Sequence, residues 1–361
     1  MKVQNILIIK LGSIGDVVHT LPTLHSLRKN FPQAHIAWVI EPKSRDILIN
    51  HPDLNEIITF ERTNSTWRTI GAFFRLVKKL RRNKYDCVLE LQGNLKGGLL
   101  AWLTGSSSRL GFEAGSSRVE RFSTLFTNIK VEEGDVPHIL ERNLNFARKL
   151  GVEDREISFP MAIGREEKEY IGSFLKEKGI SDRQIVILHP GVTWDTKRWP
   201  RERYARLAEE IQGRFENVAV VLTYGPGERY LAEDIRKLSR SSPIVSPPTT
   251  LGQLIALLER SQVFVSSDTG PLHIAAALGK RVIGLYGPVD SRRNGPYGRG
   301  NFVIKKDLPC QPCWQKKCSS RACMKGIEVS EVREKVELLL ETYNAEEKIR
   351  GQEAKGASKK L

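Results

Sequence analysis

Residues 268–279 read Asp-Thr-Gly-Pro-Leu-His-Ile-Ala-Ala-Ala-Leu-Gly and lie between two short apolar runs, 263–265 and 282–286. This order predicts a strand, a tight turn, a short helix and a second strand. Proline is well tolerated in the first turn of a helix, where its missing N–H costs nothing. The free N–H groups at such a helix start favour phosphate. The segment alone fits a phosphate site and an ordinary capped helix equally well.

The same alternation of strands and helices runs through most of the chain. Strand-like segments at 3–10, 35–40, 56–60 and 85–91 alternate with helical patterns in the first half, and those at 185–189, 218–223, 244–245, 263–265 and 281–285 do so in the second. Such alternation predicts parallel sheets covered by helices. We therefore expect an α/β fold with two Rossmann-like domains facing a central cleft, at 1–160 and 161–343. Residues 344–361 are polar and rich in lysine, and we expect a flexible basic tail there.

The composition fits a soluble globular protein with a strong positive charge. The chain has 361 residues and a formal net charge of +15, which attracts polyanions such as nucleic acid, anionic lipid or a phosphorylated glycan. The basic residues are densest around a predicted amphipathic helix at 67–82. We find no apolar run of about 18 residues, and residues 1–10 fit a first strand better than a signal peptide. A cytoplasmic protein is expected.

Four of the five cysteines lie close together at Cys310, Cys313, Cys318 and Cys323. In an intracellular protein such a cluster favours metal binding or neighbouring thiols over disulfides. The spacing departs from that of paired CxxC zinc ribbons. We therefore weigh a structural zinc site against plain thiols, and nothing here resembles a catalytic metal centre.

The first strand is followed by Lys-Leu-Gly-Ser-Ile-Gly-Asp at 10–16. Its two glycines permit a close approach of backbone and ligand, although the GxGxxG dinucleotide fingerprint is not formed. Asp16 fits an acid in the first turn of a helix. As an ionised carboxylate at the mouth of a cleft, it would also fit a general base.

Two further loops follow strands in the second half. The loop at 189–200 carries Thr193 and Lys197, which suit a phosphate, and the turn at 224–228 ends in Glu228, which suits a ribose hydroxyl or a helix cap. Together with 268–279, three loops offer hydroxyls, a lysine and acids at one sheet edge. This combination predicts a nucleotide-diphosphate site with a sugar projecting toward Asp16.

Taken together, these segments resemble glycosyltransferase family 9, the ADP-heptose:lipopolysaccharide heptosyltransferases. The matching pieces run in the expected order over most of residues 1–300: 10–16, 19–22, 38–41, 92–93, 189–200, 268–279 and 286–288. The resemblance implies a GT-B fold and inverting transfer that requires no cofactor for catalysis. Segment 38–41 is similar to heptosyltransferase I and loop 191–193 to other members, so types I, II and III stay open, with type I favoured.

The resemblance also implies residue roles and partners. Asp16 would deprotonate an acceptor hydroxyl, and Lys197 would stabilise the departing ADP with help from Thr269 and Gly270. The remaining donor contacts would come from Asp268, His273, Thr193 and Glu228, and acceptor contacts from Lys96, Arg118, His138 and Arg142. The partners would be ADP-heptose and the anionic Kdo–lipid A core at the inner face of the cytoplasmic membrane, with no nucleic acid.

Four other functions compete with this one. A nicotinamide oxidoreductase would require the GxGxxG fingerprint. A nucleic-acid-binding protein would explain the charge but predicts a recognisable binding module. An epimerase of the same fold, or a transferase using another nucleotide sugar, stays open, and an epimerase would consume its substrate without an acceptor.

Overall fold

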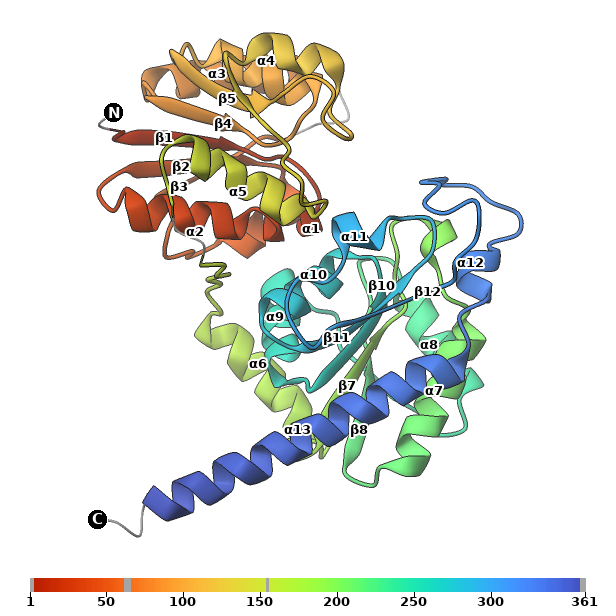
Figure 1. The fold of residues 1–361 in the computed structure, drawn as a ribbon. Coiled ribbons are helices and arrows are strands. Elements are labelled where there is room, and N and C mark those ends of the chain that lie inside the picture. Colours follow the sequence, from red (N-terminus) through yellow and green to blue (C-terminus); the bar gives the residue numbers. More distant parts are fainter. Residues whose placement is uncertain (1–2, 62–65, 154–155, 358–361) are drawn as a thin grey trace. The chain divides into compact units, whose positions relative to one another are not determined.

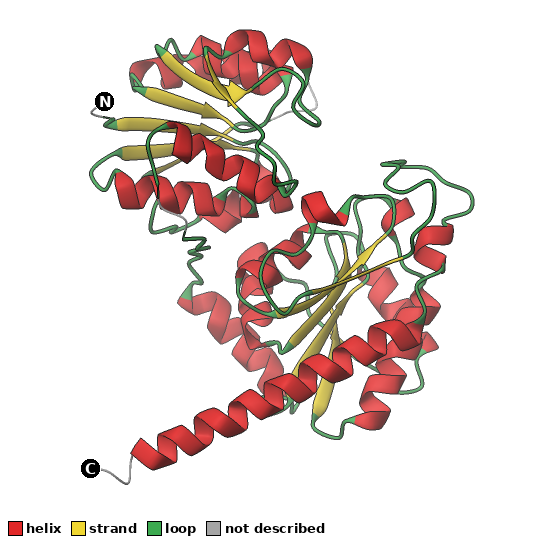
Figure 2. Cartoon of the chain, viewed as in Figure 1, coloured by secondary structure: helices red, strands yellow, loops and turns green. Residues whose placement is uncertain are grey.

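The computed structural model describes residues 3–61, 66–153 and 156–357. The chain divides into two compact units, Met1–Ala162 and Ile163–Leu361. Each unit is built on its own six-stranded parallel sheet with helices on both faces (Figures 1 and 2).

The first unit has the strand order β3-β2-β1-β4-β5-β6. Helices α3 and α4 lie side by side on one face of the sheet, and α2 and α5 lie on the other (Figure 1). Ile6 to Ile9 of β1 are fully buried, as expected for a parallel strand covered on both faces. The elements are β1 (Asn5–Ile9), α1 (Ile14–Val18), α2 (Leu21–Asn30), β2 (His35–Ile40), the 3₁₀ helix η1 (Pro42–Leu48), β3 (Glu56–Thr59), α3 (Thr66–Arg82), β4 (Cys87–Glu90), α4 (Leu95–Leu103), β5 (Ser108–Phe112), the 3₁₀ helix η2 (Arg121–Phe126), β6 (Ile129–Val131) and α5 (Ile139–Lys149).

The second unit has the strand order β12-β11-β10-β7-β8-β9. Helices α7, α8 and α13 cover one face and α6, α9 and α10 the other (Figure 1). The elements are α6 (Arg165–Glu177), β7 (Gln184–His189), the 3₁₀ helix η3 (Asp195–Lys197), α7 (Arg201–Arg214), β8 (Val218–Leu222), α8 (Arg229–Leu238), β9 (Ile244–Val245), α9 (Leu251–Arg260), β10 (Val263–Ser267), α10 (Gly270–Ala277), β11 (Arg281–Tyr286), α11 (Ser291–Asn294), β12 (Phe302–Lys305), α12 (Ala322–Lys325) and α13 (Val329–Ala357).

The two sheets share one topology. When β7 is counted as the first strand of its unit, both sheets read 3-2-1-4-5-6, the doubly wound order of Rossmann folds. The order reverses between β1 and β4 in the first unit and between β7 and β10 in the second. Ligands of such folds bind beyond the carboxyl ends of the strands at this switch point.

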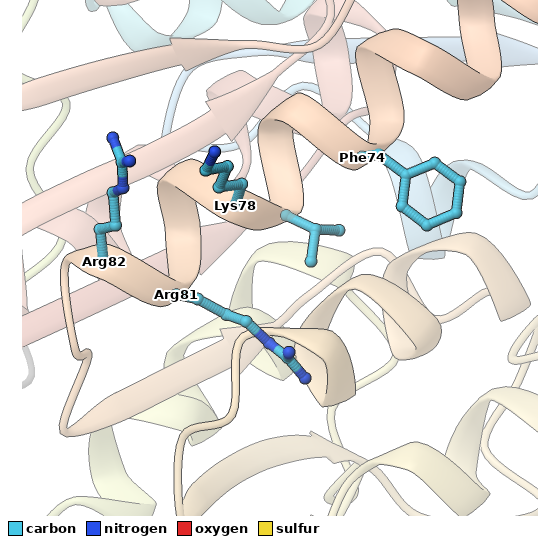
Figure 3. Close-up of a pocket in the computed structure, with 5 residues that line it drawn as sticks. Phe74, Lys78, Arg81 and Arg82 are labelled. Atoms are coloured by element: carbon cyan, nitrogen blue, oxygen red, sulfur yellow. The ribbon is translucent and has the colours of Figure 1, made fainter.

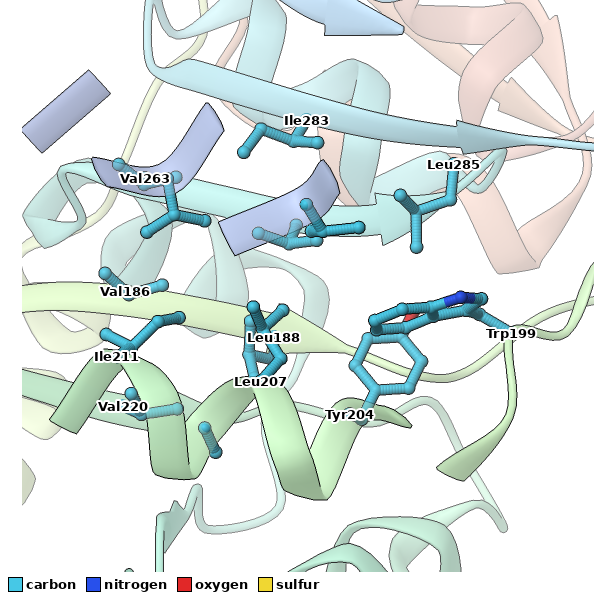
Figure 4. Packing of buried hydrophobic residues seen from close by; sticks show 14 of the residues in the cluster. Val186, Leu188, Trp199, Tyr204, Leu207, Ile211, Val220, Val263, Ile283 and Leu285 are labelled. Atoms are coloured by element: carbon cyan, nitrogen blue, oxygen red, sulfur yellow. The ribbon is translucent and has the colours of Figure 1, made fainter. Parts of the chain in front are cut away.

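The core of the second unit fixes the loop that follows β7. Trp199 and Tyr204 are fully buried, with their rings edge to face at 4.8 Å (Figure 4). Trp199 Nε1 donates a hydrogen bond to the carbonyl of Ile327 at 3.0 Å. Because Trp199 lies at the end of the 189–200 loop, its burial in the core fixes the position at which this loop joins α7.

The structure corrects several expected elements. A break at His19-Thr20 divides the helical pattern that follows the first expected strand into α1 and α2, because Pro22 has no N–H for helical pairing. Strands β5, β6 and β12 are additional.

The sequence predicted a flexible tail at 344–361, whereas the structure continues α13 as a helix to Ala357. Arg350 pairs with Glu346 and Glu347 one turn earlier, which supports the helix. In the part of the chain that the structure describes, no helix is long and apolar enough to cross a membrane.

Candidate functional site

The switch point of the second unit brings Lys197 and Asp268 together. Strands β7 and β10 are neighbours, so the loops that follow them meet at one edge of the sheet. Lys197 Nζ lies 2.5 Å from Asp268 Oδ2 and 3.3 Å from the Asp268 carbonyl oxygen. The sequence predicted that both residues lie at this edge but not that they form an ion pair.

Asp268 is held from a second side by His273. The Nε2 atom of His273 lies 3.1 Å from Asp268 Oδ1, and both side chains are buried. Burial alone would raise the pKa of Asp268, but the hydrogen bond from His273 and the charge of Lys197 outweigh it, so the pKa lies below its usual value. Asp268 is therefore an anion that fixes the position of the lysine ammonium group.

Lys197 is also in contact with an aromatic ring. Its Nζ lies 4.6 Å from the ring centroid of Trp194, which is a cation–π distance. Only 12% of the Lys197 side chain is exposed. A cation held between a carboxylate and a ring is already oriented before any ligand arrives. Nothing in the sequence pattern distinguished Trp194 as a contact of Lys197.

The start of α10 lies beside this ion pair. Thr269 is the N-cap residue, its side chain makes no capping bond, and a proline occupies the first turn. The Thr269 hydroxyl instead lies 3.0 Å from Ser266 Oγ. The free backbone N–H groups in the first turn of α10 can therefore donate hydrogen bonds to an anion. The predicted residues Lys197, Asp268, Thr269, Gly270 and His273 thus lie in one place.

Glu228 connects two neighbouring loops. It precedes α8, and its Oε1 accepts a hydrogen bond from Val192 N at 3.3 Å. A Cβ at Gly191 would lie 2.2 Å from Glu228 Oε2, so any larger residue at 191 would displace the Glu228 carboxylate. Thr193 follows in the same loop and is exposed.

In the first unit, Asp16 lies in the first turn of α1, directly after the loop that follows β1. Its Oδ2 accepts hydrogen bonds from Ser13 N at 3.0 Å and Ser13 Oγ at 2.8 Å. The carboxylate therefore has the helix-capping role that its position predicted. A Cβ at Gly12 would lie 2.6 Å from Asp16 Oδ2, so any larger residue at position 12 would displace the Asp16 carboxylate. The pairing with Ser13 follows from their three-residue spacing, which the sequence prediction did not use.

The loop that carries Asp16 is tied to the loop after β4. Gln92 Oε1 accepts a hydrogen bond from Leu11 N at 2.9 Å, and Lys10 Nζ donates one to the Leu91 carbonyl at 2.6 Å. Lys96, in the first turn of α4, lies 3.0 Å from Glu41 Oε1 and 4.2 Å from the Phe60 ring centroid. Burial would raise the pKa of Glu41, but Lys96 and Lys43 lower it overall. Asp16 and Lys96 thus follow the two strands of the switch point.

The other predicted acceptor residues come from α5 and a loop. His138 caps α5 by accepting from Leu140 N, and its ring packs edge to face on His19 at 5.3 Å. Asn143 of the same helix donates to the Thr20 hydroxyl, which in turn donates to the Asp16 carbonyl at 2.8 Å. α5 thus contacts the segment that carries Asp16.

The two arginines predicted to bind the acceptor lie in different environments. Arg142 is buried and forms an ion pair with Glu133. Arg118 is exposed in the loop between β5 and η2, with a backbone φ of 63°.

The four clustered cysteines do not assemble a metal site. Burial chiefly raises the pKa of the Cys323 thiol, and the nearby Cys313 and Cys310 add to the rise. Cys318 Sγ accepts a hydrogen bond from Arg321 N at 3.4 Å. Among residues 3–61, 66–153 and 156–357, no three His, Cys, Asp or Glu side chains are arranged to hold a metal ion. The cysteine side chains are therefore not arranged as zinc ligands in this structure, and the structural zinc ion stays an untested prediction.

Comparison with known proteins identifies the family. The profile of glycosyltransferase family 9 (heptosyltransferase) matches residues 73–324, well over half of the chain. The chain belongs to glycosyltransferase family 9. The predicted family and the predicted enzyme class, a glycosyltransferase, are therefore confirmed.

Individual relatives of this family 9 member are heptosyltransferases of several types. Lipopolysaccharide heptosyltransferase 1 of Pseudomonas aeruginosa is 28% identical over 326 residues, which cover 88% of each chain. Lipopolysaccharide heptosyltransferase 3 of Escherichia coli K12 is 28% identical over 281 residues, covering 76% of this chain and 80% of the relative.

A solved structure confirms the predicted α/β GT-B fold. The E. coli ADP-heptose lipopolysaccharide heptosyltransferase II matches with a TM-score of 0.76 and 24% identity, over 94% of this chain and all of that one.

Proposed function

We propose that this family 9 enzyme transfers heptose from ADP-heptose to the Kdo/heptose inner core of lipopolysaccharide, and that it adds the first heptose. The observation that carries the proposal is the Lys197–Asp268–His273 cluster at the start of α10, which lies at the switch point of its sheet. Such a cluster suits the diphosphate of a nucleotide sugar. The names of the relatives supply the identity of the sugar and of the acceptor.

The donor lies in the second unit under this proposal. Its diphosphate accepts hydrogen bonds from the N–H groups at Gly270 and beyond, and Lys197 balances the charge that grows as ADP departs. Asp268 and His273 hold Lys197 and the α10 start in place. Thr193 adds a hydroxyl to the phosphates, and Glu228 accepts from the ribose.

The acceptor lies in the first unit. Asp16 takes the proton of an acceptor hydroxyl, and that oxygen attacks the anomeric carbon while the bond to the ADP oxygen breaks, which inverts the configuration. Lys96, Arg118, His138 and Arg142 bind the carboxylates and phosphates of the inner core. This route places proton transfer on a side chain and leaving-group charge on Lys197 and helix α10, so it requires no catalytic metal.

The location follows from the substrates. An acceptor with a lipid anchor and a soluble nucleotide sugar meet at the cytoplasmic face of the inner membrane, so we propose a cytoplasmic enzyme that binds this surface peripherally. The net charge of +15 favours that anionic surface. Nucleic acid is not a proposed partner.

The test is a transfer assay with two acceptors, Kdo2–lipid A and the same molecule already carrying one heptose, each incubated with ADP-heptose and read by mass spectrometry. We expect one heptose on the first acceptor. Gain on the second acceptor alone would assign type II, whereas type III, the type of the E. coli K12 relative, would require an acceptor that already carries two heptoses. If ADP-heptose does not bind at all, the donor assignment is wrong. If it binds without transfer to either acceptor, the acceptor assignment is wrong.

A further inference from the structure

Three neighbouring elements of the first unit are basic and contain no acidic residue. The segments Thr66–Arg82, Leu95–Leu103 and Arg121–Phe126 form α3, α4 and η2 and hold no Asp or Glu. Their basic residues are Arg68, Arg75, Lys78, Lys79, Arg81, Arg82, Lys96 and Arg121. The proposed reaction uses only Lys96 of this set, and Lys79 pairs with Glu56 at 2.7 Å. The remaining positive charge has no assigned role.

The same elements expose large apolar side chains. Leu125 is 76% exposed, Phe122 69%, Phe74 66% and Trp102 52%. Ile70 and Leu95 are also exposed. On α3 the exposed Ile70 and Phe74 are followed by cations, and Phe74, Lys78, Arg81 and Arg82 project from the helix around a surface hollow (Figure 3). Clustered apolar side chains at the surface mark interaction sites.

Contacts join the three elements into one surface. Arg81 Nε donates to the Leu103 carbonyl at 2.9 Å, which fastens α3 to α4. A Cβ at Gly98 would lie 2.6 Å from the Ser123 carbonyl oxygen, so α4 lies directly against η2. The rings of Trp102 and Phe126 are 6.2 Å apart. We call this the α3–α4–η2 surface.

We propose that the α3–α4–η2 surface docks on an anionic phospholipid bilayer. The inference deepens the proposed function and rests on it, since a lipid-anchored acceptor requires the enzyme at a membrane. Exposed Trp, Phe and Leu enter the headgroup and acyl boundary, while Lys and Arg pair with anionic headgroups. The surface presents both chemistries together.

Other occupants fit less well. In a symmetric dimer through this surface, like charges would face each other with no carboxylate from these elements to balance them. Nucleic acid would match the cations but would leave Leu125 and Leu95 without a role, since unstacked bases pack on aromatic side chains. The bilayer alone satisfies the cations and the aliphatic side chains.

The experiment is vesicle flotation of the full chain. One set of vesicles is phosphatidylcholine, and the other contains about one third phosphatidylglycerol. The variants are Phe122→Ser with Leu125→Ser, and Lys78→Glu with Arg82→Glu. Matched controls change exposed residues of the second unit: Tyr230→Ser with Leu238→Ser, and Lys176→Glu with Lys237→Glu. Circular dichroism confirms that each variant is folded.

We expect the wild type and both controls to float with the anionic vesicles only. Each surface variant should bind these vesicles at least about tenfold more weakly than the wild type. Flotation of the surface variants at the wild-type level, or no binding of the wild type, would overturn the proposal. So would self-association or RNA binding that the same variants abolish while vesicle binding persists.

A parallel assay separates this inference from the proposed function. Transfer to a deacylated, water-soluble acceptor should be equal in the wild type and the surface variants. Absence of that transfer in the wild type would contradict the proposed function and leave the flotation result standing.

Discussion

Lys197 contacts the Asp268 carboxylate and the Trp194 ring, both in its own unit. If it stabilises the charge of the departing ADP, Lys197→Ala should lower kcat by about 10²-fold or more, because a preorganised cation acts most in the transition state. Steady-state kinetics with saturating ADP-heptose would measure this.

Lys316 offers a matched control for Lys197. Its Nζ lies 5.1 Å from the same Trp194 ring, but we assign it no ligand. Lys316→Ala should keep wild-type turnover. Equal losses in both variants would show that the effect comes from the ring or the local fold and not from leaving-group stabilisation.

Asp16 combines a capping contact with its proposed role as base. Asp16→Asn keeps a side-chain oxygen for Ser13 N but cannot take a proton at neutral pH. We expect transfer to fall by about 10²- to 10⁴-fold, with ADP-heptose binding by calorimetry unchanged. Ser13→Ala removes the hydroxyl that donates to Asp16 and keeps the carboxylate, so it should retain most activity. Normal turnover in Asp16→Asn would refute the base assignment.

His189, at the end of β7, gives the second unit a pH-dependent stability. Burial lowers its pKa from 6.5 to about 4, so the folded state keeps the ring neutral while the unfolded chain takes up a proton below about pH 6.5. The neutral ring therefore contributes about 3 kcal/mol to the free energy of unfolding above that pH, and this contribution is lost as the pH falls toward 4. Urea unfolding from pH 7.5 to 4.5 should show a shallower decline in His189→Gln than in the wild type, and equal slopes would contradict the assignment.

At the scale of elements, α13 is anchored by one buried stripe. Val332, Val336 and Leu340 are fully buried in the core cluster of the second unit, whereas Leu338 is 45% exposed. Leu340→Ala should therefore lower the free energy of unfolding by about 2–5 kcal/mol, measured by urea denaturation. Leu338→Ala should stay within about 1 kcal/mol of the wild type, and similar losses at both positions would contradict this packing.

The whole molecule is expected to work without a catalytic metal. Extended dialysis against EDTA should leave the transfer rate unchanged, because Lys197 and the α10 start carry the charge stabilisation that a metal would otherwise supply. Elemental analysis of the purified chain tests the separate zinc prediction for the cysteine cluster. Inactivation by EDTA with recovery on adding magnesium would contradict the proposed chemistry.

Sequence reasoning recovered the elements whose strands are long and apolar, such as β1 and β10. It missed β5, β6 and β12 because these strands are short or mix polar residues with apolar ones: β5 contains Arg109 and Gly111, and β6 has three residues. It predicted that Lys197 and Asp268 share a sheet edge, since both follow strands. The pairs Lys197–Asp268 and Lys96–Glu41 join residues 71 and 55 positions apart, and only the folded register brings their atoms together.

The repeated strand order has a consequence for how this enzyme can change over generations. All six strands of each sheet come from a single unit, and the proposed donor and acceptor residues belong to different units. Mutation or recombination can therefore change the ligand-binding residues of one unit while the other unit continues to bind the same ligand. A lineage could acquire a new acceptor sugar without having to evolve a new way of holding ADP.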